Sequence, residues 1–169
     1  MTVARLVLAA VVLLRLVELF HAHRNTKALI RRGGVEIGAR HYPLFIVLHT
    51  AWLASLFFFV PADAPISWPW FAVLLLMQAA RLWCLKSLGP WWTTRIITLP
   101  DAPLVRRGPY RFIRHPNYAV VAGEIAALPM VFGAWRIALI FSLCNAALLA
   151  WRIHVEARAL APRRALPSS

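Results

Sequence analysis

Residues 118–151 read YAVVAGEIAALPMVFGAWRIALIFSLCNAALLAW and contain two apolar runs, Tyr118–Phe132 and Trp135–Trp151, joined by Gly133 and Ala134. Each run approaches the roughly 20 residues with which an α-helix crosses the hydrocarbon of a bilayer. Glycine at such a junction favours a tight turn between helices. The stretch therefore predicts a hairpin of two membrane helices, the first of them short enough to be tilted, re-entrant or sheltered by its neighbours.

Three further apolar runs precede this hairpin, at Val3–Phe20, Leu44–Val60 and Trp68–Leu85. Residues 61–65 contain two prolines and separate the second run from the third, which predicts another tight helical hairpin. The sequence thus predicts an all-α, polytopic membrane protein with about five transmembrane helices.

Composition and charge support a membrane protein. Hydrophobic residues make up 61% of the chain and charged residues only 15%, against roughly 25% charged residues in average globular chains. The net charge is +13, and most Lys and Arg residues fall within residues 21–43, 86–117 and 152–164. Basic blocks between apolar runs are typical of cytoplasmic membrane loops and do not suit a nucleic-acid-binding face. We therefore expect an external N-terminus, a cytoplasmic C-terminus and a bacterial inner membrane.

The longest connection between apolar runs ends in LVRRGPYRFIRHPNY at residues 104–118. A Gly-Pro pair favours a turn there, and Pro116 suits the first position of a helix, with His115 extended just before it. His115 and Tyr118 are thereby held at the mouth of an apolar helix. Either residue could instead belong to the interfacial belt of a membrane protein.

The last apolar segment carries a polar stripe. Asn145, Leu149, Arg152 and Glu156 step by 4, 3 and 4 residues and so lie along one helix face. This spacing directs the polar members toward the bundle interior at the inner membrane boundary. The alternative is an Arg–Glu pair at a helix end in the headgroup region.

Ionisable residues also occur within earlier apolar runs, where they are costly. Arg15 and Glu18 are three residues apart, as are Gln78 and Arg81, so each pair shares one helix face. The spacing predicts a buried ion pair and a snorkelling arginine that hold helices together. His49, alone in its apolar run, is expected to be a core histidine with a satisfied hydrogen bond.

Three segments together closely resemble the isoprenylcysteine carboxyl methyltransferase family of integral membrane enzymes, which use S-adenosylmethionine. They are GPWWTTR at residues 89–95, GPYRFIRHPNY at residues 108–118 and, after a helical hairpin, RIHVE at residues 152–156. Family members often carry two adjacent acids at the last site, whereas this chain has Ala157 after its one acid.

The resemblance implies a site for S-adenosylmethionine, which needs cations or helix N-terminal amides, an acid and aromatic faces. The residues that supply such groups are His115, Pro116 at the helix start, Tyr118 and Glu124. By the same resemblance, Arg152 holds an acceptor oxygen near the transferred methyl, and Glu156 fixes its guanidinium by charge-assisted hydrogen bonds. Asn145, on the same stripe, is expected to contact the substrate.

This interpretation describes residues 1–169 as a single membrane-embedded domain. Residues 1–85 hold the first three spans, residues 86–160 form the cofactor-binding and catalytic region, and residues 161–169 form a flexible tail. Both cysteines lie inside apolar runs, and methyl transfer requires no metal, so no metal site is expected.

The expected activity is methylation of a carboxylate or hydroxyl oxygen on a small lipophilic acceptor that enters from the bilayer. Membrane lipids surround the protein, and no nucleic-acid partner is expected. No G-x-G-x-x-G motif follows a predicted strand, which excludes a soluble Rossmann methyltransferase. Two alternatives stay open: a membrane reductase with a lipophilic substrate, and a non-enzymatic scaffold or lipid-binding protein whose arginines contact anionic headgroups.

Overall fold

The computed structural model describes residues 2–99, 102 and 104–161. Within those residues the chain forms five α-helices: α1 (Val3–Arg31), α2 (Tyr42–Phe59), α3 (Trp68–Leu88), α4 (Pro116–Val131) and α5 (Trp135–Ala159). Two short strands, β1 (Val35–Ile37) and β2 (Ile96–Thr98), and three 3₁₀ turns, Ala39–His41, Gly89–Trp91 and Gly108–Arg111, complete the described elements. The prediction of an all-α architecture is confirmed. The expected flexible tail lies outside the described residues from position 162 onward.

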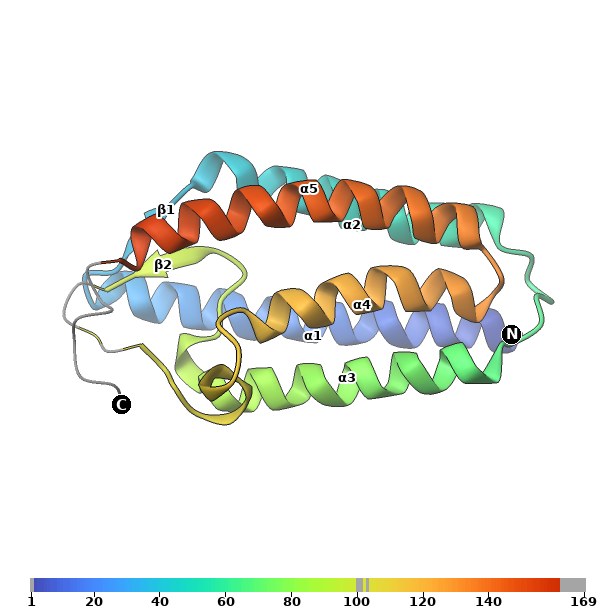
Figure 1. The fold of residues 1–169 in the computed structure, drawn as a ribbon, viewed down its shortest axis with the longest axis horizontal. Coiled ribbons are helices and arrows are strands. Elements are labelled where there is room, and N and C mark those ends of the chain that lie inside the picture. Colours follow the sequence, from blue (N-terminus) through green and yellow to red (C-terminus); the bar gives the residue numbers. More distant parts are fainter. Residues whose placement is uncertain (1, 100–101, 103, 162–169) are drawn as a thin grey trace.

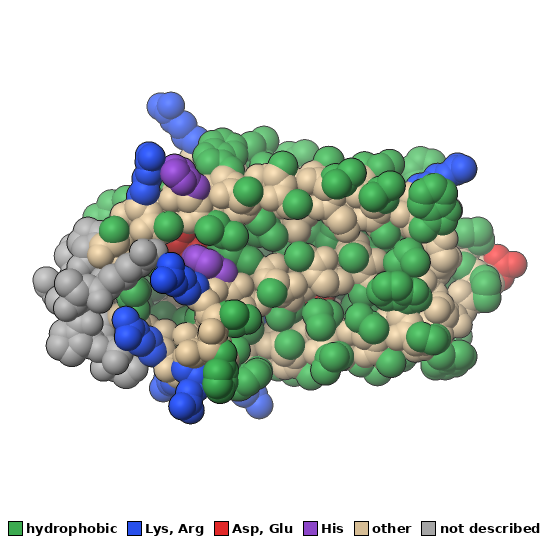
Figure 2. All heavy atoms as spheres, in the orientation of Figure 1, with side chains coloured by type: hydrophobic (Ala, Val, Ile, Leu, Met, Phe, Trp, Pro, Cys, Tyr) green, Lys and Arg blue, Asp and Glu red, His purple; other side chains and the backbone are tan. Residues whose placement is uncertain are grey.

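The helices lie side by side in an elongated bundle and run alternately in opposite directions (Figure 1). The N-terminus lies at one end, and β1, β2 and the start of α4 lie toward the other (Figure 1). Hydrophobic side chains cover much of the visible face, and most of the Lys and Arg side chains seen there lie near the end that carries the strands (Figure 2). The bundle therefore has one strongly basic end.

Three helical segments are long and apolar enough to cross a membrane, namely Ala39–Phe59, Trp68–Trp91 and Trp135–Ala159. Their outward side chains include exposed Phe58, Leu76 and Leu143. Such continuous apolar surface is unfavourable in water and is typical of a lipid-facing protein. These helices indicate an integral membrane protein, while the count of about five spans stays a prediction.

Helix α4 is short, with 16 residues, and is the most enclosed of the helices. It packs between α3 and α5 (Figure 1). Ile125, Leu128 and Val131 are fully buried and join a core that also includes Leu56 of α2. This packing agrees with a fourth apolar segment sheltered by its neighbours.

The predicted hairpin of α4 and α5 is confirmed. Gly133 has a φ of +68°, a left-handed conformation that favours glycine, and the Ala134 amide donates to the Pro129 carbonyl at 2.9 Å. These features reverse the chain within three residues, 132–134. Helices α4 and α5 then pack along their lengths.

The predicted hairpin of the second and third helices is wrong. Helix α2 packs on α5 and α1, whereas α3 packs on α4. Residues 60–67 span the end of the bundle, and the Ser67 amide donates to the Val131 carbonyl at 2.8 Å. An extended segment of this length can reach about 25 Å, enough to connect helices that are not each other's main packing partners.

Two local features also differ from the sequence expectation. Helix α1 continues beyond the apolar run to Arg31, because residues 21–31 are polar but still include good helix formers. Strands β1 and β2 pair antiparallel, with Val35 opposite Thr98 and Ile37 opposite Ile96. The pair connects the end of α1 to the segment that follows α3.

Candidate active site

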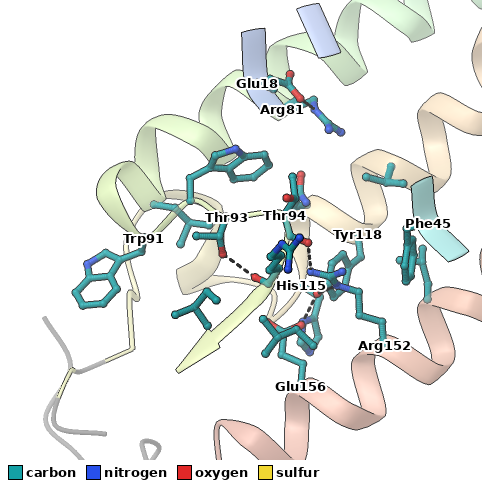
Figure 3. Close-up of a pocket in the computed structure, with 18 of the residues that line it drawn as sticks. Glu18, Phe45, Arg81, Trp91, Thr93, Thr94, His115, Tyr118, Arg152 and Glu156 are labelled. Atoms are coloured by element: carbon teal, nitrogen blue, oxygen red, sulfur yellow. Dashed lines mark hydrogen bonds and ion pairs between the residues drawn. The ribbon is translucent and has the colours of Figure 1, made fainter. Parts of the chain in front are cut away.

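A cavity of about 980 Å³ opens within the bundle toward the end that carries β1 and β2. Its walls come from all five helices, from residues 91–97 and from residues 104–106 and 110–115. This volume lies at the upper end of the range for small-molecule sites and suits two ligands bound together. Figure 3 shows ten labelled residues of its wall.

The polar stripe of α5 faces the interior, as predicted. Asn145 is 1% exposed and Arg152 is 8% exposed, with buried Leu149 between them. The Arg152 guanidinium donates from Nε to the Tyr118 hydroxyl at 2.8 Å and from Nη2 to the Thr94 carbonyl at 2.7 Å. It also lies over the Phe45 ring, 5.2 Å from the ring centroid (Figure 3). Residues from three other parts of the chain therefore fix the guanidinium of Arg152 at the cavity wall.

The expected direct contact between Arg152 and Glu156 is replaced by a bridge. Within the described residues these two side chains share no hydrogen bond or ion pair. Instead, the Tyr118 hydroxyl accepts from Arg152 and donates a short hydrogen bond to Glu156 Oε2. The Arg152 side chain reaches toward Thr94, and Tyr118 of α4 lies between Arg152 and Glu156 (Figure 3).

His115 completes this group from the start of α4. Its ring stacks on the Tyr118 ring with centroids 5.2 Å apart and planes 9° apart. Its Nδ1 lies 3.6 Å from Glu156 Oε2. Pro116 occupies the first turn of α4 as expected, although the φ of −129° and ψ of 57° at His115 are less extended than predicted. Pro116 is buried beside the cavity without lining it, so it acts through the backbone it fixes.

Residues 94 and 95, just before β2, form a functional segment whose contacts sequence reasoning missed. The Thr94 carbonyl, which holds Arg152, is itself fixed by a hydrogen bond of 3.1 Å between Thr94 Oγ1 and the Tyr42 hydroxyl. Next to it, Arg95 Nη1 donates to both oxygens of Glu36 in β1 at 2.9 Å. The motif at residues 89–95 indicated that this segment belongs to the site, but nothing in it indicated that Arg95 pairs with Glu36, which precedes α2.

The turn before α4 is held against α3. Gly108 has a φ of +58°, and a side chain there would collide with Ser87. Arg107 Nε donates to the Ser87 carbonyl at 2.7 Å. The turn places Tyr110 in the cavity wall, and burial raises the pKa of its phenol well above the usual range. Tyr110 is therefore a neutral hydrogen-bonding group at physiological pH.

Glu124 lies behind the cavity wall rather than in it. It receives hydrogen bonds from Arg81 Nη1 at 2.8 Å and from Gln78 Nε2 at 2.9 Å, and it also pairs with Arg15. The predicted Arg15–Glu18 ion pair is present at 3.0 Å. Both oxygens of the Glu124 carboxylate are thus engaged by protein groups, which leaves it no direct path to a cofactor.

Asn145 also lies outside the cavity lining, although it belongs to the same stripe as Arg152. Its Oδ1 is buried and has no hydrogen-bond partner among the described residues. The structure therefore brings together His115, Tyr118, Arg152 and Glu156, and it leaves Glu124 and Asn145 out of that group.

These features define a helical integral membrane protein with a polar site enclosed at one end of its bundle. The family model for the isoprenylcysteine carboxyl methyltransferase (ICMT) family matches residues 70–162, more than half of the chain. The chain therefore belongs to this family of membrane methyltransferases, which confirms the resemblance. The matched region contains α4, α5 and the four residues of the central group.

Two relatives match along nearly the whole chain. An uncharacterized protein of Bacillus subtilis, YpbQ, is 38% identical over 160 residues, which cover 92% of this chain and 95% of the relative. An uncharacterized protein of Haemophilus influenzae is 26% identical over 159 residues, covering 90% and 91% of the two chains. No solved structure matches the chain significantly.

The cavity wall fits S-adenosylmethionine, the methyl donor of the family. Asn117 Oδ1 is buried in the wall without a hydrogen-bond partner among the described residues, so it can accept from an ammonium group. Arg106, Arg111 and Arg114 also line the cavity and can pair with a carboxylate. The stacked rings of His115 and Tyr118 offer aromatic surface for an adenine.

Proposed function

We propose that the protein is an S-adenosylmethionine-dependent methyltransferase that methylates a carboxylate or hydroxyl oxygen of a small lipophilic acceptor. The observation that carries this proposal is the fixed guanidinium of Arg152 in the cavity of an isoprenylcysteine carboxyl methyltransferase family member. When bound, S-adenosylmethionine supplies a methyl group on a sulfonium, and the protein must position an oxygen in line with it.

Arg152 is suited to hold that oxygen. A guanidinium has five N–H donors, and only two of them are used by Tyr118 and Thr94. The remaining donors can bind an oxygen in the cavity. Glu156, through the Tyr118 hydroxyl, holds the guanidinium in place and can take up a proton at Oε2 when the acceptor is a hydroxyl compound.

His115, Tyr118 and Asn117 are proposed to contact the cofactor. His115 and Tyr118 lie at the mouth of α4, and the basic loop before them supports binding of a carboxylate on the same side. Pro116 contributes by fixing the start of the helix.

The acceptor is proposed to be lipophilic and to enter from the bilayer. Leu16 and Leu19 of α1 and Ile46 of α2 line the cavity and are also exposed on the outside of the bundle. Apolar side chains that line the cavity and are also exposed on the outside of the bundle support a route from the lipid to the site. Membrane lipids are the other expected contacts.

We further propose five spans in a bacterial inner membrane, with the N-terminus external and the C-terminus cytoplasmic. The alternating helix directions and the concentration of basic residues at one end support this orientation (Figures 1 and 2). It puts the mouth of the cavity on the cytoplasmic side, where S-adenosylmethionine is made.

Isothermal titration of the detergent-purified protein with S-adenosylmethionine tests the cofactor assignment. We expect saturable micromolar binding that S-adenosylhomocysteine displaces. Transfer of a labelled methyl group to a fatty acid, an alkylphenol or a farnesylated cysteine then tests the activity. Absence of cofactor binding contradicts the proposal, and binding without transfer to any oxygen acceptor contradicts its acceptor class.

A further inference from the structure

The inner end of the cavity contains a second polar group that the proposed chemistry does not use. Arg15 and Glu18 of α1 and Arg81 of α3 line this part of the wall. Arg81 Nε pairs with Glu18 Oε2 at 2.8 Å, and Glu124 holds both arginines from behind. Figure 3 shows Glu18 and Arg81 on the side of the cavity opposite Glu156. Two arginines and two glutamates make this inner cluster neutral overall.

Three N–H donors at this end have no hydrogen-bond partner among the described residues. They are Arg15 Nε, Trp52 Nε1 and Trp92 Nε1, and all three residues line the cavity. Trp52 and Trp92 are each only 3% exposed. An indole nitrogen is a donor only, and a buried donor without a partner is destabilising. Helix α1, helix α2 and the turn after α3 thus each contribute one unpartnered N–H donor to residues that line the same cavity.

The chemistry of these donors defines that group. Only an electron-rich atom can accept from all three, which points to oxygen. Because the inner cluster is already neutral, a carboxylate would add an uncompensated buried charge, whereas a carbonyl or ether oxygen would not. The surrounding wall is aliphatic, with Val12, Leu53 and Val121, and so suits a lipophilic molecule.

We infer that the inner end of the cavity is a second recognition site, which binds an uncharged oxygen of the methyl acceptor through Trp52, Trp92 and Arg15. This inference rests on the proposed function. It means that the methyl acceptor is held at two places, Arg152 and the inner end of the cavity. Thr94, which holds Arg152, follows Trp92 by two residues, so their Cα atoms are at most about 7 Å apart. The acceptor therefore carries one oxygen for methylation and a second, uncharged oxygen for the inner end of the cavity.

A single buried water is the competing explanation for two of the donors. A small cavity of about 20 Å³, lined by Arg15, Trp52 and Glu124, adjoins the inner end and is large enough for one water molecule. A water there would bind Trp52 without any role in recognition, whereas Trp92 does not line that small cavity. Comparing Trp52 with Trp92 separates the two explanations.

The experiment measures binding of a matched pair of probes, an alkylphenol and the acylphenol of the same chain length, to protein saturated with S-adenosylhomocysteine. The acylphenol adds an uncharged carbonyl oxygen, and because that carbonyl also makes the phenol more acidic, both probes are compared at a pH at which both phenols are neutral. We expect wild-type protein to bind the acylphenol about tenfold more tightly than the alkylphenol. Trp52→Phe and Trp92→Phe keep an aromatic ring but remove the N–H, and each should reduce this preference to twofold or less.

Trp135→Phe is the matched control, because Trp135 is exposed at the start of α5, at the far end of the bundle. It should keep the tenfold preference. Equal affinity of the two probes for wild type, failure of wild type to bind either probe, or an unchanged preference in both Trp52→Phe and Trp92→Phe overturns the inference. A change in Trp52→Phe stability with no change in preference assigns that donor to the buried water. Failure of methyl transfer with the carbonyl preference intact would instead contradict only the proposed function.

Discussion

Replacing Tyr118 with Phe tests the bridge at the centre of the site. The substitution removes one hydroxyl, which accepts from Arg152 and donates to Glu156. The ring stays, and so does its stacking on His115. The variant therefore tests the orientation of Arg152, while it keeps the aromatic surface that is proposed to contact the cofactor.

The size of the effect follows from the two hydrogen bonds. Bonds to charged groups contribute about 1.5–3 kcal/mol each, and Glu156 is partly exposed, so water replaces part of the loss. Arg152 also keeps its bond to the Thr94 carbonyl. We expect a net loss of about 1.5–3 kcal/mol of transition-state stabilisation, which is a fall of roughly 10- to 100-fold in kcat/KM.

Methyl-transfer kinetics and cofactor titration are measured on the same preparation of Tyr118→Phe. Affinity for S-adenosylmethionine should stay within about threefold of wild type. Tyr42→Phe is the comparison, because the Tyr42 hydroxyl contacts Thr94 and so acts one step further from Arg152. Its turnover should fall less, by about two- to fivefold. Wild-type turnover in Tyr118→Phe would refute the bridge, and a parallel loss of cofactor affinity would assign the hydroxyl to cofactor binding.

Four further predictions concern neighbouring features. Arg152→Lys should lose most turnover in the methyl-transfer assay while it keeps cofactor affinity within a few-fold, because an ammonium cannot reproduce the planar donor set; unchanged turnover would contradict its role. His115→Ala should weaken binding of S-adenosylmethionine about tenfold in titration, and wild-type affinity would contradict the cofactor assignment. Glu124→Gln should destabilise the protein by about 3–5 kcal/mol in detergent unfolding yet leave cofactor affinity unchanged, since it breaks a buried ion-pair cluster behind the wall; a selective loss of affinity would restore it to the site. A reporter fused to the C-terminus should be active only in the cytoplasm, and periplasmic activity would reverse the proposed orientation.

Helix positions could be predicted from the sequence because apolar runs and their boundaries are local signals. The turn at Gly133 and the helix start at Pro116 depend on the conformational limits of those residues, and both are present in the structure. Helix neighbours are set by packing between distant segments. That is why proline-containing residues 61–65 suggested a hairpin, although α2 packs mainly on α5 and α1 and α3 packs mainly on α4.

The central group was also only partly predictable. Helical spacing correctly put Arg152 and Glu156 on one face, but spacing within α5 could not reveal that Tyr118 from another helix stands between them. The carboxylate of Glu124 suggested a contact with the cofactor, but Arg81 and Gln78 of α3 bind that carboxylate instead. Strand β2 is three residues long and pairs with a strand about 60 residues earlier, so it leaves no periodic signal.

The group around Arg152 includes side chains from a part of the chain that lies before the region matched by the family model. The family model begins at residue 70, yet Tyr42 and Phe45 before it reach the same guanidinium assembly as residues after it. The surroundings of Arg152 are thus completed by α2, which lies before the matched region. The position of Arg152 therefore depends on α2 as well as on α4, so a substitution in α2 can move the guanidinium without any change in the matched region.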